Sequence, residues 1–290
     1  MTLTQEQTVT EKAPPSFLNQ PPTFPSPTKK TPRKKVGLAL SGGVARGPVH
    51  VGVISALEQA GIPIDCIAGT SAGAIVGAAY CAGLEIPQLR TLAANSGWRN
   101  MINLTRSRHG LFSFSKMEWM ITEMVGNLDV CDLSIPFTAV VTDMVIGERV
   151  YLRQGSLATA VRASCSVPGV ITPVEIDGSY YCDGGISDNI PVDAVREMGA
   201  DYIIAVDLFV PHYRPGLGFL GASLAALELL IRHAGGGAKE ADCVIEPAIA
   251  GHNYFNFSRR KSQEYMRLGE AAAESMIPTI KAALAVEKTT

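Results

Sequence analysis

The chain has 290 residues, and its 25 Lys and Arg against 27 Asp and Glu give a formal net charge of −2 at pH 7. Hydrophobic residues make up 47% of the sequence and charged residues 18%, which excludes an intrinsically disordered chain and is typical of a globular protein with a large core. Six basic and two acidic residues give residues 1–35 a net charge of +4 and leave −6 for the rest, and such an acidic body does not resemble a nucleic-acid-binding protein.

Residues 1–34 form a basic tail rich in Pro and Thr, which we expect to be disordered and to precede one domain at 35–290. Seven of the 18 prolines and none of the 28 glycines lie in residues 1–35. The basic run at 29–35 allows two interpretations, contact with an anionic membrane surface or a solvated leader. The sequence contains neither an apolar secretory signal nor an apolar run of about 18 residues, so we expect a cytoplasmic protein that is at most peripheral to a membrane.

The six cysteines do not form a metal-binding or disulfide pattern. None belongs to a C-x-x-C pair, and several lie in apolar runs, where a free cysteine behaves as a small core residue. We therefore expect reduced thiols, no metal and no cofactor. The cysteines are Cys66, Cys81, Cys131, Cys165, Cys182 and Cys243.

The predicted elements begin with a strand, a helix and a second strand. Val36–Leu40 is an apolar run that ends at a glycine-rich loop, and residues 49–60 have apolar side chains at helical spacing before Gly61. Residues 64–68 form the next strand, and the Ala- and Gly-rich residues 71–81 form a buried helix. This order predicts a right-handed βαβ unit with a parallel sheet that is covered on both faces.

The rest of the body continues the alternation of strands and helices. Residues 217–231 allow two interpretations: a helix of the core, which we favour because Ala-rich apolar helices usually pack inside, or an amphipathic lid or membrane-facing helix. The other predicted helices are 87–126 with a loop at 103–113, 156–163 and 263–284. The other predicted strands are 137–143, 149–152, 174–176, 180–182, 202–208 and 243–246.

The pentapeptide at residues 69–73 matches the pattern G-x-S-x-G between a predicted strand and a predicted helix. A sharp turn at this place pushes the Ser71 side chain outward, and the flanking glycines allow neighbouring backbone to approach. The start of the helix also favours negative charge that develops nearby. These features make Ser71 a candidate nucleophile, the alternative being a turn without chemistry.

A second glycine-rich loop joins the first strand to the first helix at residues 41–47. It is not a phosphate-binding P-loop, because Pro48 and Val49 stand where the Lys and the hydroxyl residue are required. It also lacks the dinucleotide-binding pattern G-x-G-x-x-G, because Val44 stands at the third position of the pattern, where a glycine is required. The remaining interpretations are a plain connecting turn and an oxyanion hole for a reaction at Ser71, which the adjacent strand ends favour.

A nucleophilic serine needs a base that accepts its proton. None of the five histidines lies in a recognisable motif, and we expect His50 to pack inside the first helix. Carboxylates at predicted strand ends are stronger candidates, namely Asp143, Asp183 and Asp207. Asp183 is the most favourable of these, because the two glycines that follow it leave room for another element to come within hydrogen-bond distance.

Together these motifs resemble those of bacterial patatin-like phospholipases, in the branch related to neuropathy target esterase. The match runs from about Val36 to Ile280. The resemblance implies a three-layer α/β/α fold with a mainly parallel central sheet. The matching motifs are Gly42–Gly47, His50–Val53, Gly69–Gly73, Val141–Asp143, Arg162–Gly169, and Asp183–Gly185 with Asn189 and Pro191.

The resemblance also implies the chemistry, which is hydrolysis of carboxylic esters of (lyso)phospholipids or related acyl lipids without a catalytic histidine. Ser71 would be the nucleophile and Asp183 the general base. The oxyanion hole would consist of the N–H groups of Gly42, Gly43 and Val44. The supporting motif positions are Arg46, Gly47, Gly69, Ala72, Gly73, Gly184 and Gly185.

Val44 departs from the family pattern, because many members have a third glycine here. A β-branched residue strongly disfavours positive φ, so we expect this position to keep a negative φ and to narrow the pocket without loss of activity. Two alternatives to the dyad stay open. One is an α/β-hydrolase triad of Ser71, Asp183 and His252, and the other is a catalytically idle lipid-binding regulator on the same scaffold.

Overall fold

A computed structural model describes residues 33–95, 97, 101–105, 110, 112–208, 218–249 and 257–285. Of the expected tail, only Arg33 and Lys34 belong to these residues, and both contact the body. Arg33 forms an ion pair with Asp65 at 2.6 Å, and Lys34 Nζ donates to the carbonyl of Ala283 at 2.7 Å. Residues 1–32 lie outside the described residues.

The central sheet is mostly parallel, as predicted, and has the strand order β10-β9-β1-β2-β5-β8-β7, with β6 beside β5. Strands β6 and β8 run antiparallel to β5, and β7 runs antiparallel to β8. The parallel strands are β1 (Val36–Leu40), β2 (Cys66–Thr70), β5 (Phe137–Asp143), β9 (Tyr202–Val206) and β10 (Cys243–Ile245). The others are β6 (Arg149–Leu152), β7 (Val174–Ile176) and β8 (Ser179–Asp183).

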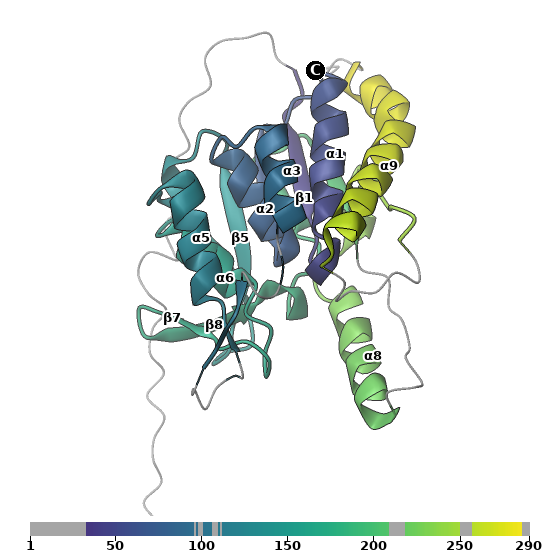
Figure 1. Ribbon diagram of the computed structural model, residues 1–290. Coiled ribbons are helices and arrows are strands. Elements are labelled where there is room, and N and C mark those ends of the chain that lie inside the picture. The colour runs from purple at the N-terminus through teal and green to yellow at the C-terminus, as the bar shows by residue number, and fades with distance from the viewer. Residues whose placement is uncertain are drawn as a thin grey trace, which may run out of the picture.

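Helices cover both faces of this sheet and make three layers (Figure 1). All residues of β1, β2, β5 and β9 are buried, as a sheet covered on both sides requires. In β1, Leu38 and Leu40 join the larger hydrophobic cluster while Ala39 joins the smaller one under α7 (Val192–Glu197). The larger cluster includes α1 (Pro48–Gln59), α2 (Ala72–Cys81), α3 (Ile86–Asn95) and α9 (Arg259–Ala285).

Helices α1 and α9 pack with their backbones in close contact. A Cβ added to Gly52 of α1 would collide with the carbonyl oxygen of Met266, and one added to Gly269 of α9 would collide with that of Val49. The two glycines therefore face each other across one interface. Only a residue without a side chain allows the helices to approach this closely.

Helices α5 and α6, which lie across α2 from α1 and α9 in Figure 1, are joined by an ion pair. Glu118 of α5 (Ser115–Val125) accepts from Arg162 of α6 (Leu157–Ser164) at 2.6 Å and from the Thr159 hydroxyl at 2.7 Å.

The region at residues 103–113 that we expected to be a loop contains a short antiparallel pair, β3 (Asn103–Leu104) and β4 (Phe112–Ser113). The 3₁₀ turns are η2 (Val44–Arg46), η3 (Val130–Asp132), η4 (Gly184–Ile186) and η6 (Ala238–Glu240).

The sequence favoured a core helix at residues 217–231, and this prediction is wrong for the side chains that the structure describes in helix α8 (Gly218–Arg232). Leu229 is 51% exposed and Leu230 is 70% exposed, and in Figure 1 the helix extends away from the three layers. Ile231 lies near Gly185 of η4, because a Cβ on this glycine would lie 3.7 Å from its side chain. Helix α8 therefore touches the body next to the end of β8.

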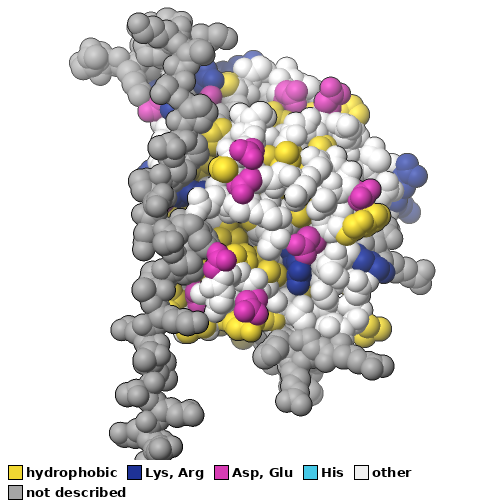
Figure 2. Space-filling model, turned by 90° about the vertical axis from the view of Figure 1, so that its left-hand side faces the viewer, with side chains coloured by type: hydrophobic (Ala, Val, Ile, Leu, Met, Phe, Trp, Pro, Cys, Tyr) yellow, Lys and Arg dark blue, Asp and Glu magenta, His cyan; other side chains and the backbone are white. Residues whose placement is uncertain are grey.

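The surface carries scattered charges. On the face shown in Figure 2, acidic side chains are spread among uncharged ones, and basic side chains stand apart from one another. Among the helices that the structure describes, none combines the length and hydropathy needed to cross a membrane.

Candidate active site

The topology of β5 brings two distant strand ends together. Strands β2 and β8 share one edge of β5, because residues 139–142 pair with β6 on the other edge. Thr70 at the end of β2 pairs with Val140, and Asp183 at the end of β8 pairs with Val141. The two strands therefore meet end to end, and Ser71, which follows β2, lies beside Asp183.

Ser71 occupies a strained turn between β2 and α2. Its φ of 52° and ψ of −116° lie outside the usual regions for a residue with a side chain, as in the nucleophile elbows of serine hydrolases. A Cβ on Gly73 would collide with the backbone of Leu40, so this tight turn requires glycine there. The Ser71 N–H donates to the Ser164 hydroxyl at 2.9 Å, which links the turn to α6.

Asp183 is buried, and its carboxylate and its N–H each form a hydrogen bond. Its Oδ1 accepts from the Gly185 N–H at 2.8 Å, and its own N–H donates to the carbonyl of Ser166 at 2.9 Å. The Ser71 side chain lies near the carboxylate. Burial raises the pKa of Asp183 to about 6, against the opposing effects of the Gly185 N–H and the Ser71 side chain. This carboxylate can accept a proton from Ser71 near neutral pH.

The glycine-rich loop at residues 42–44 presents two N–H groups rather than three. The Gly42 N–H donates to both the backbone carbonyl and the side-chain Oδ1 of Asn189, at 3.3 Å and 3.2 Å. No described residue accepts from the N–H of Gly43 or Val44. Two backbone donors remain for a developing oxyanion, and Asn189 fixes the loop that carries them.

Our expectation of a negative φ at Val44 is wrong, because its φ is 52°. Such a conformation costs a β-branched residue on the order of 1–3 kcal/mol and persists only where the surroundings impose it. Arg46 is fully buried and donates to the carbonyl of Leu208 at 2.9 Å, while the Leu208 N–H donates to the Ser41 hydroxyl at 2.9 Å. These contacts hold both ends of the strained turn.

The remaining small motif residues occupy the junctions between these segments. A Cβ on Gly47 would lie 3.3 Å from the Cβ of Ala72, so the glycine-rich loop rests on the start of α2. The others are Gly69 within β2 and Gly184 and Gly185, the first two residues of η4.

Two described histidines, His50 and His233, and the strand-end carboxylate of Asp143 have partners or surroundings other than Ser71. His50 is fully buried, its Nε2–H donates to the Ser41 carbonyl at 2.8 Å, and burial lowers its pKa to about 4, so it packs as predicted. His233 is exposed after the end of α8. Asp143 accepts from the Val145 N–H at 2.8 Å and thereby closes the turn after β5. His109, His212 and His252 lie outside the described residues.

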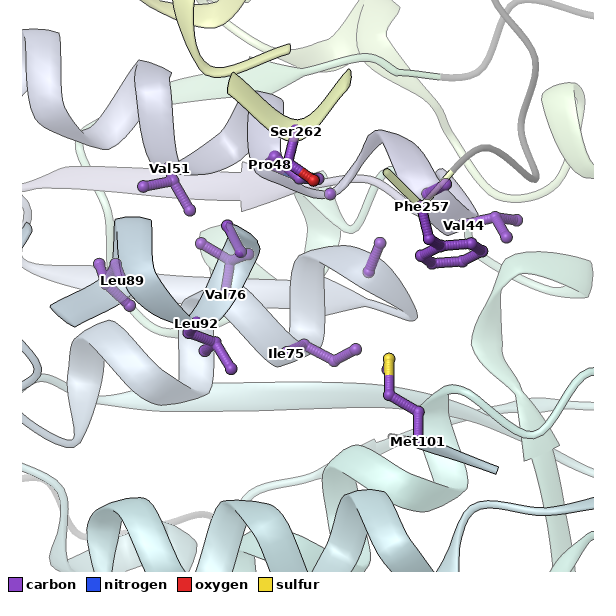
Figure 3. Close-up of a pocket in the computed structure, with 14 residues that line it drawn as sticks. Val44, Pro48, Val51, Ile75, Val76, Leu89, Leu92, Met101, Phe257 and Ser262 are labelled. Atoms are coloured by element: carbon purple, nitrogen blue, oxygen red, sulfur yellow. The ribbon is translucent and has the colours of Figure 1, made fainter. Parts of the chain in front are cut away.

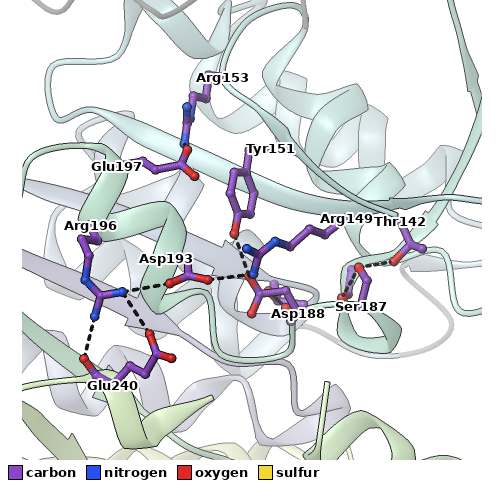
Figure 4. A network of polar contacts seen from close by, with 12 residues as sticks. Thr142, Arg149, Tyr151, Arg153, Ser187, Asp188, Asp193, Arg196, Glu197 and Glu240 are labelled. Atoms are coloured by element: carbon purple, nitrogen blue, oxygen red, sulfur yellow. Dashed lines mark hydrogen bonds and ion pairs between the residues drawn. The ribbon is translucent and has the colours of Figure 1, made fainter. Parts of the chain in front are cut away.

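A second buried carboxylate, which the sequence analysis missed, supports the segment after Asp183. Asp188 is 1% exposed and accepts from the Tyr151 hydroxyl at 2.9 Å and from Arg149 at 3.5 Å (Figure 4). Its carbonyl accepts from the Thr70 hydroxyl at 2.9 Å. Burial raises the pKa of Asp188 to about 6 despite these partners. The network fixes the backbone between Asp183 and Asn189 against β2 and β6.

The pKa of Asp183 gives a prediction for the pH dependence of any reaction in which it acts as the base. The ionised form is the active one, so kcat/KM for an uncharged soluble ester should rise with pH through about 6 and level off above it. Asp188 has a pKa in the same range, so Asp188→Asn is the matched control and should keep this rise. Measurement of kcat/KM against pH in the wild type and in Asp188→Asn checks the assignment. If the rise with pH disappeared in Asp188→Asn, it would be assigned to Asp188.

No group of three or more His, Cys, Asp and Glu side chains in the described ranges has an arrangement that could hold a metal ion. The arrangement at the ends of β1, β2 and β8 provides a hydroxyl, a buried carboxylate and two backbone donors. These are the groups that acyl transfer through a serine requires.

The motifs also match known proteins in sequence. The family model for patatin-like phospholipases matches residues 38–196. An NTE family protein of Mycobacterium tuberculosis is 40% identical over 177 residues, which cover 60% of this chain and 49% of that protein. Lysophospholipase nte1 of Aspergillus fumigatus is 37% identical over 181 residues, covering 60% of this chain and 12% of that protein. Neuropathy target esterase sws of Drosophila melanogaster is 34% identical over 181 residues, which cover 60% of this chain and 13% of that protein. The chain thus spans about half the length of the first relative and a small part of the others.

Two solved structures are similar in three dimensions at low sequence identity. The complex of SpcU with ExoU from the type III secretion system of Pseudomonas aeruginosa matches with a TM-score of 0.51 at 13% identity, covering 88% of this chain and 53% of that chain. VipD from Legionella pneumophila matches with a TM-score of 0.46 at 16% identity, covering 83% and 67%. At this level of identity, the likeness to the former concerns the fold alone.

Proposed function

The chain belongs to the patatin-like phospholipase family, and on that basis we propose that it hydrolyses carboxylic esters of acyl lipids through a dyad of Ser71 and Asp183. The observation that carries the proposal is the placement of Ser71, at a strained turn after β2, beside a buried carboxylate at the end of β8 whose pKa is raised to about 6. A carboxylate of this kind activates a serine without an intervening histidine.

The reaction proceeds in two stages. Asp183 accepts the Ser71 proton as the oxygen attacks the ester carbonyl, and the proton then passes to the leaving alcohol. Water attacks the acyl-enzyme with Asp183 again as base, and the fatty acid leaves as Ser71 regains its proton. The N–H groups of Gly43 and Val44 stabilise the oxyanion in both stages, an effect of about 2.7–4 kcal/mol for one donor in a measured protease case.

We propose lysophospholipids and phospholipids as the first substrates to test. One relative is named a lysophospholipase and another a neuropathy target esterase. This chain spans only 12% and 13% of their lengths, so their names suggest a substrate class and leave the acyl length and head group open.

The proposal predicts that a fluorophosphonate probe labels the protein at Ser71 and that a panel of lysophospholipids, phospholipids and soluble esters contains a hydrolysed substrate. Label position is read by peptide mass spectrometry and hydrolysis by release of fatty acid. The Ser71→Ala protein is the control and should neither be labelled nor hydrolyse the substrate.

The idle regulator makes the opposite prediction. A folded protein that binds lipid vesicles without labelling and without release of fatty acid would support it. The position of Asp183 beside Ser71 favours the enzyme, because a carboxylate with a pKa of about 6 can accept the serine proton near neutral pH.

A further inference from the structure

Exposed hydrophobic side chains gather at the end of the molecule that carries the candidate active site. Most of the large hydrophobic side chains that are exposed among the described residues follow β5, belong to β8 or η4, or lie near the end of α8. In Figure 1, β7, β8 and α8 lie at one end of the molecule. We call these side chains the apolar rim, and they are residues 144–146, Tyr180, Ile186, Leu229 and Leu230.

The turn at residues 144–146 presents three consecutive apolar side chains of this rim. Val145 is 76% exposed and Ile146 is 61% exposed. The turn starts three residues past the pair of Val141 and Asp183, which is about 10 Å at the usual rise of a strand. It therefore projects past the candidate active site at the carboxyl end of β5.

The backbone of this turn forms its hydrogen bonds within the protein. The N–H groups of Val145 and Ile146 donate to Oδ1 of Asp143 at 2.8 Å and 3.3 Å. Those of residues 144 and 147 donate to backbone carbonyls, both at 2.9 Å. Entry of the turn into lipid therefore leaves none of these four N–H groups without a partner, a condition that backbone in apolar surroundings must meet.

The apolar cavity that reaches Val44 and Ala72 is too small for lipid tails. Side chains of α1, α2 and α3 form most of its wall (Figure 3), and its volume is about 40 Å³. One water molecule takes about 30 Å³ of the liquid, so an acyl chain does not fit. The tails of a lipid at Ser71 that this cavity does not enclose stay in apolar surroundings only if the bilayer itself lies against the strand ends.

We propose that the apolar rim docks the protein on the surface of a phospholipid bilayer, with the turn at residues 144–146 inserted among the lipids and the candidate active site next to the membrane. The inference rests on the proposed hydrolysis of lipid esters and adds a membrane-binding surface to it. Two acidic residues and one basic residue flank the turn, namely Asp143, Glu148 and Arg149, so anionic lipid is not what attracts it. Insertion of apolar side chains needs no anionic lipid and changes little with salt.

Two double variants test the rim. Val145→Ser with Ile146→Ser, the turn variant, removes two exposed apolar side chains. Trp119→Ser with Met124→Ser, the α5 variant, is the matched control, because both side chains are exposed on a helix that lies along one flank of the sheet in Figure 1. All four side chains are exposed, so we expect both proteins to fold with little change in the thermal midpoint.

The first measurement is sedimentation of the Ser71→Ala protein with phosphatidylcholine vesicles at low and at high salt, which needs no turnover. We expect binding at both salt concentrations, a loss of at least about tenfold when the turn substitutions are added, and no change when the α5 substitutions are added. Absence of binding, or equal binding with the turn substitutions, would overturn the inference. Binding that disappears at high salt would overturn it in favour of attraction by the basic run at residues 29–35.

Light scattering of the protein without lipid tests another occupant of an apolar surface, a second copy of the chain. We expect the same mass for the wild type and the turn variant. A dimer that the turn substitutions convert into a monomer would assign the rim to self-association and overturn the inference.

The last measurement compares hydrolysis of a soluble ester with hydrolysis of phospholipid in vesicles. The turn variant should keep kcat/KM for the soluble ester and lose at least about tenfold of the rate on vesicles. Turn-dependent binding to vesicles without hydrolysis of any ester by the wild type would support the rim and contradict the proposed function. Hydrolysis of both substrates with vesicle binding that does not depend on the turn would contradict the rim alone.

Discussion

Replacement of Asp183 by Asn is expected to lower kcat/KM for a soluble ester at least about 10³-fold, and Ser71→Ala is expected to lower it to the background rate. An amide cannot take the Ser71 proton, although its oxygen can still accept from the Gly185 N–H that now holds the carboxylate at 2.8 Å. The measurement is the rate of hydrolysis of a chromogenic short-chain ester at pH 8, followed by absorbance at a single wavelength.

The loss cannot be attributed to unfolding. Because folding raises the pKa of Asp183 from 3.8 to about 6, its ionised form reduces the stability of the folded state at pH 8, and this penalty disappears as pH falls through about 6 to below 3.8. The amide side chain of the variant carries no charge to bury, so the thermal midpoint of Asp183→Asn at pH 8 should not fall below that of the wild type.

The histidine variants decide between the dyad and the triad. His252→Ala and His233→Ala should keep the wild-type rate if Asp183 acts directly on Ser71. Loss of activity in His252→Ala with a folded protein would establish the triad and remove the role of Asp183 as the direct base.

Gly52→Ala is expected to destabilise the protein by about 2–3 kcal/mol. Elsewhere in a helix this change is favourable by about 1 kcal/mol. Here the new methyl group would collide with the backbone of Met266 in α9, and backbone cannot rotate away as a flexible side chain does. The two long helices must separate to accept it.

Gly97→Ala provides the control, because a Cβ at that position would meet no atom within 4 Å. We expect its free energy of unfolding to change by less than about 0.5 kcal/mol. Urea unfolding followed by circular dichroism compares the two variants. Equal stability of Gly52→Ala and wild type would show that α1 and α9 are less closely packed than described.

Much of the fold follows from local patterns in the sequence. The strands at 36–40 and 137–143 and the elbow at Ser71 are contiguous apolar or glycine-rich segments, so periodicity and turn chemistry suffice to predict them. Asp183 was identified as a strand-end carboxylate for the same reason. Its contact with Ser71 depends on the sharing of one β5 edge by β2 and β8, which no local pattern encodes.

The features that the sequence analysis missed or misjudged depend on contacts between distant segments. Ser164 and Asn189 lie in motifs that the sequence analysis named without a role for either residue. Their hydrogen bonds hold the two candidate active-site loops at Ser71 and Gly42, and only the folded chain brings these pairs together. Val44 adopts a positive φ against its intrinsic preference, because buried contacts on both sides fix the loop. Helix α8 is apolar by composition but has little of the body to pack on.

The shared edge of β5 also bears on how the protein is made. The first strands, β1 and β2, come early in the chain and form a local βαβ unit that carries the strained Ser71 turn. Asp183 reaches this turn only when β8 pairs with the second half of β5, which lies outside the first βαβ unit. A chain in which β8 has not yet paired with β5 therefore has the proposed nucleophile without its proposed base, and the proposed lipid hydrolysis depends on that pairing.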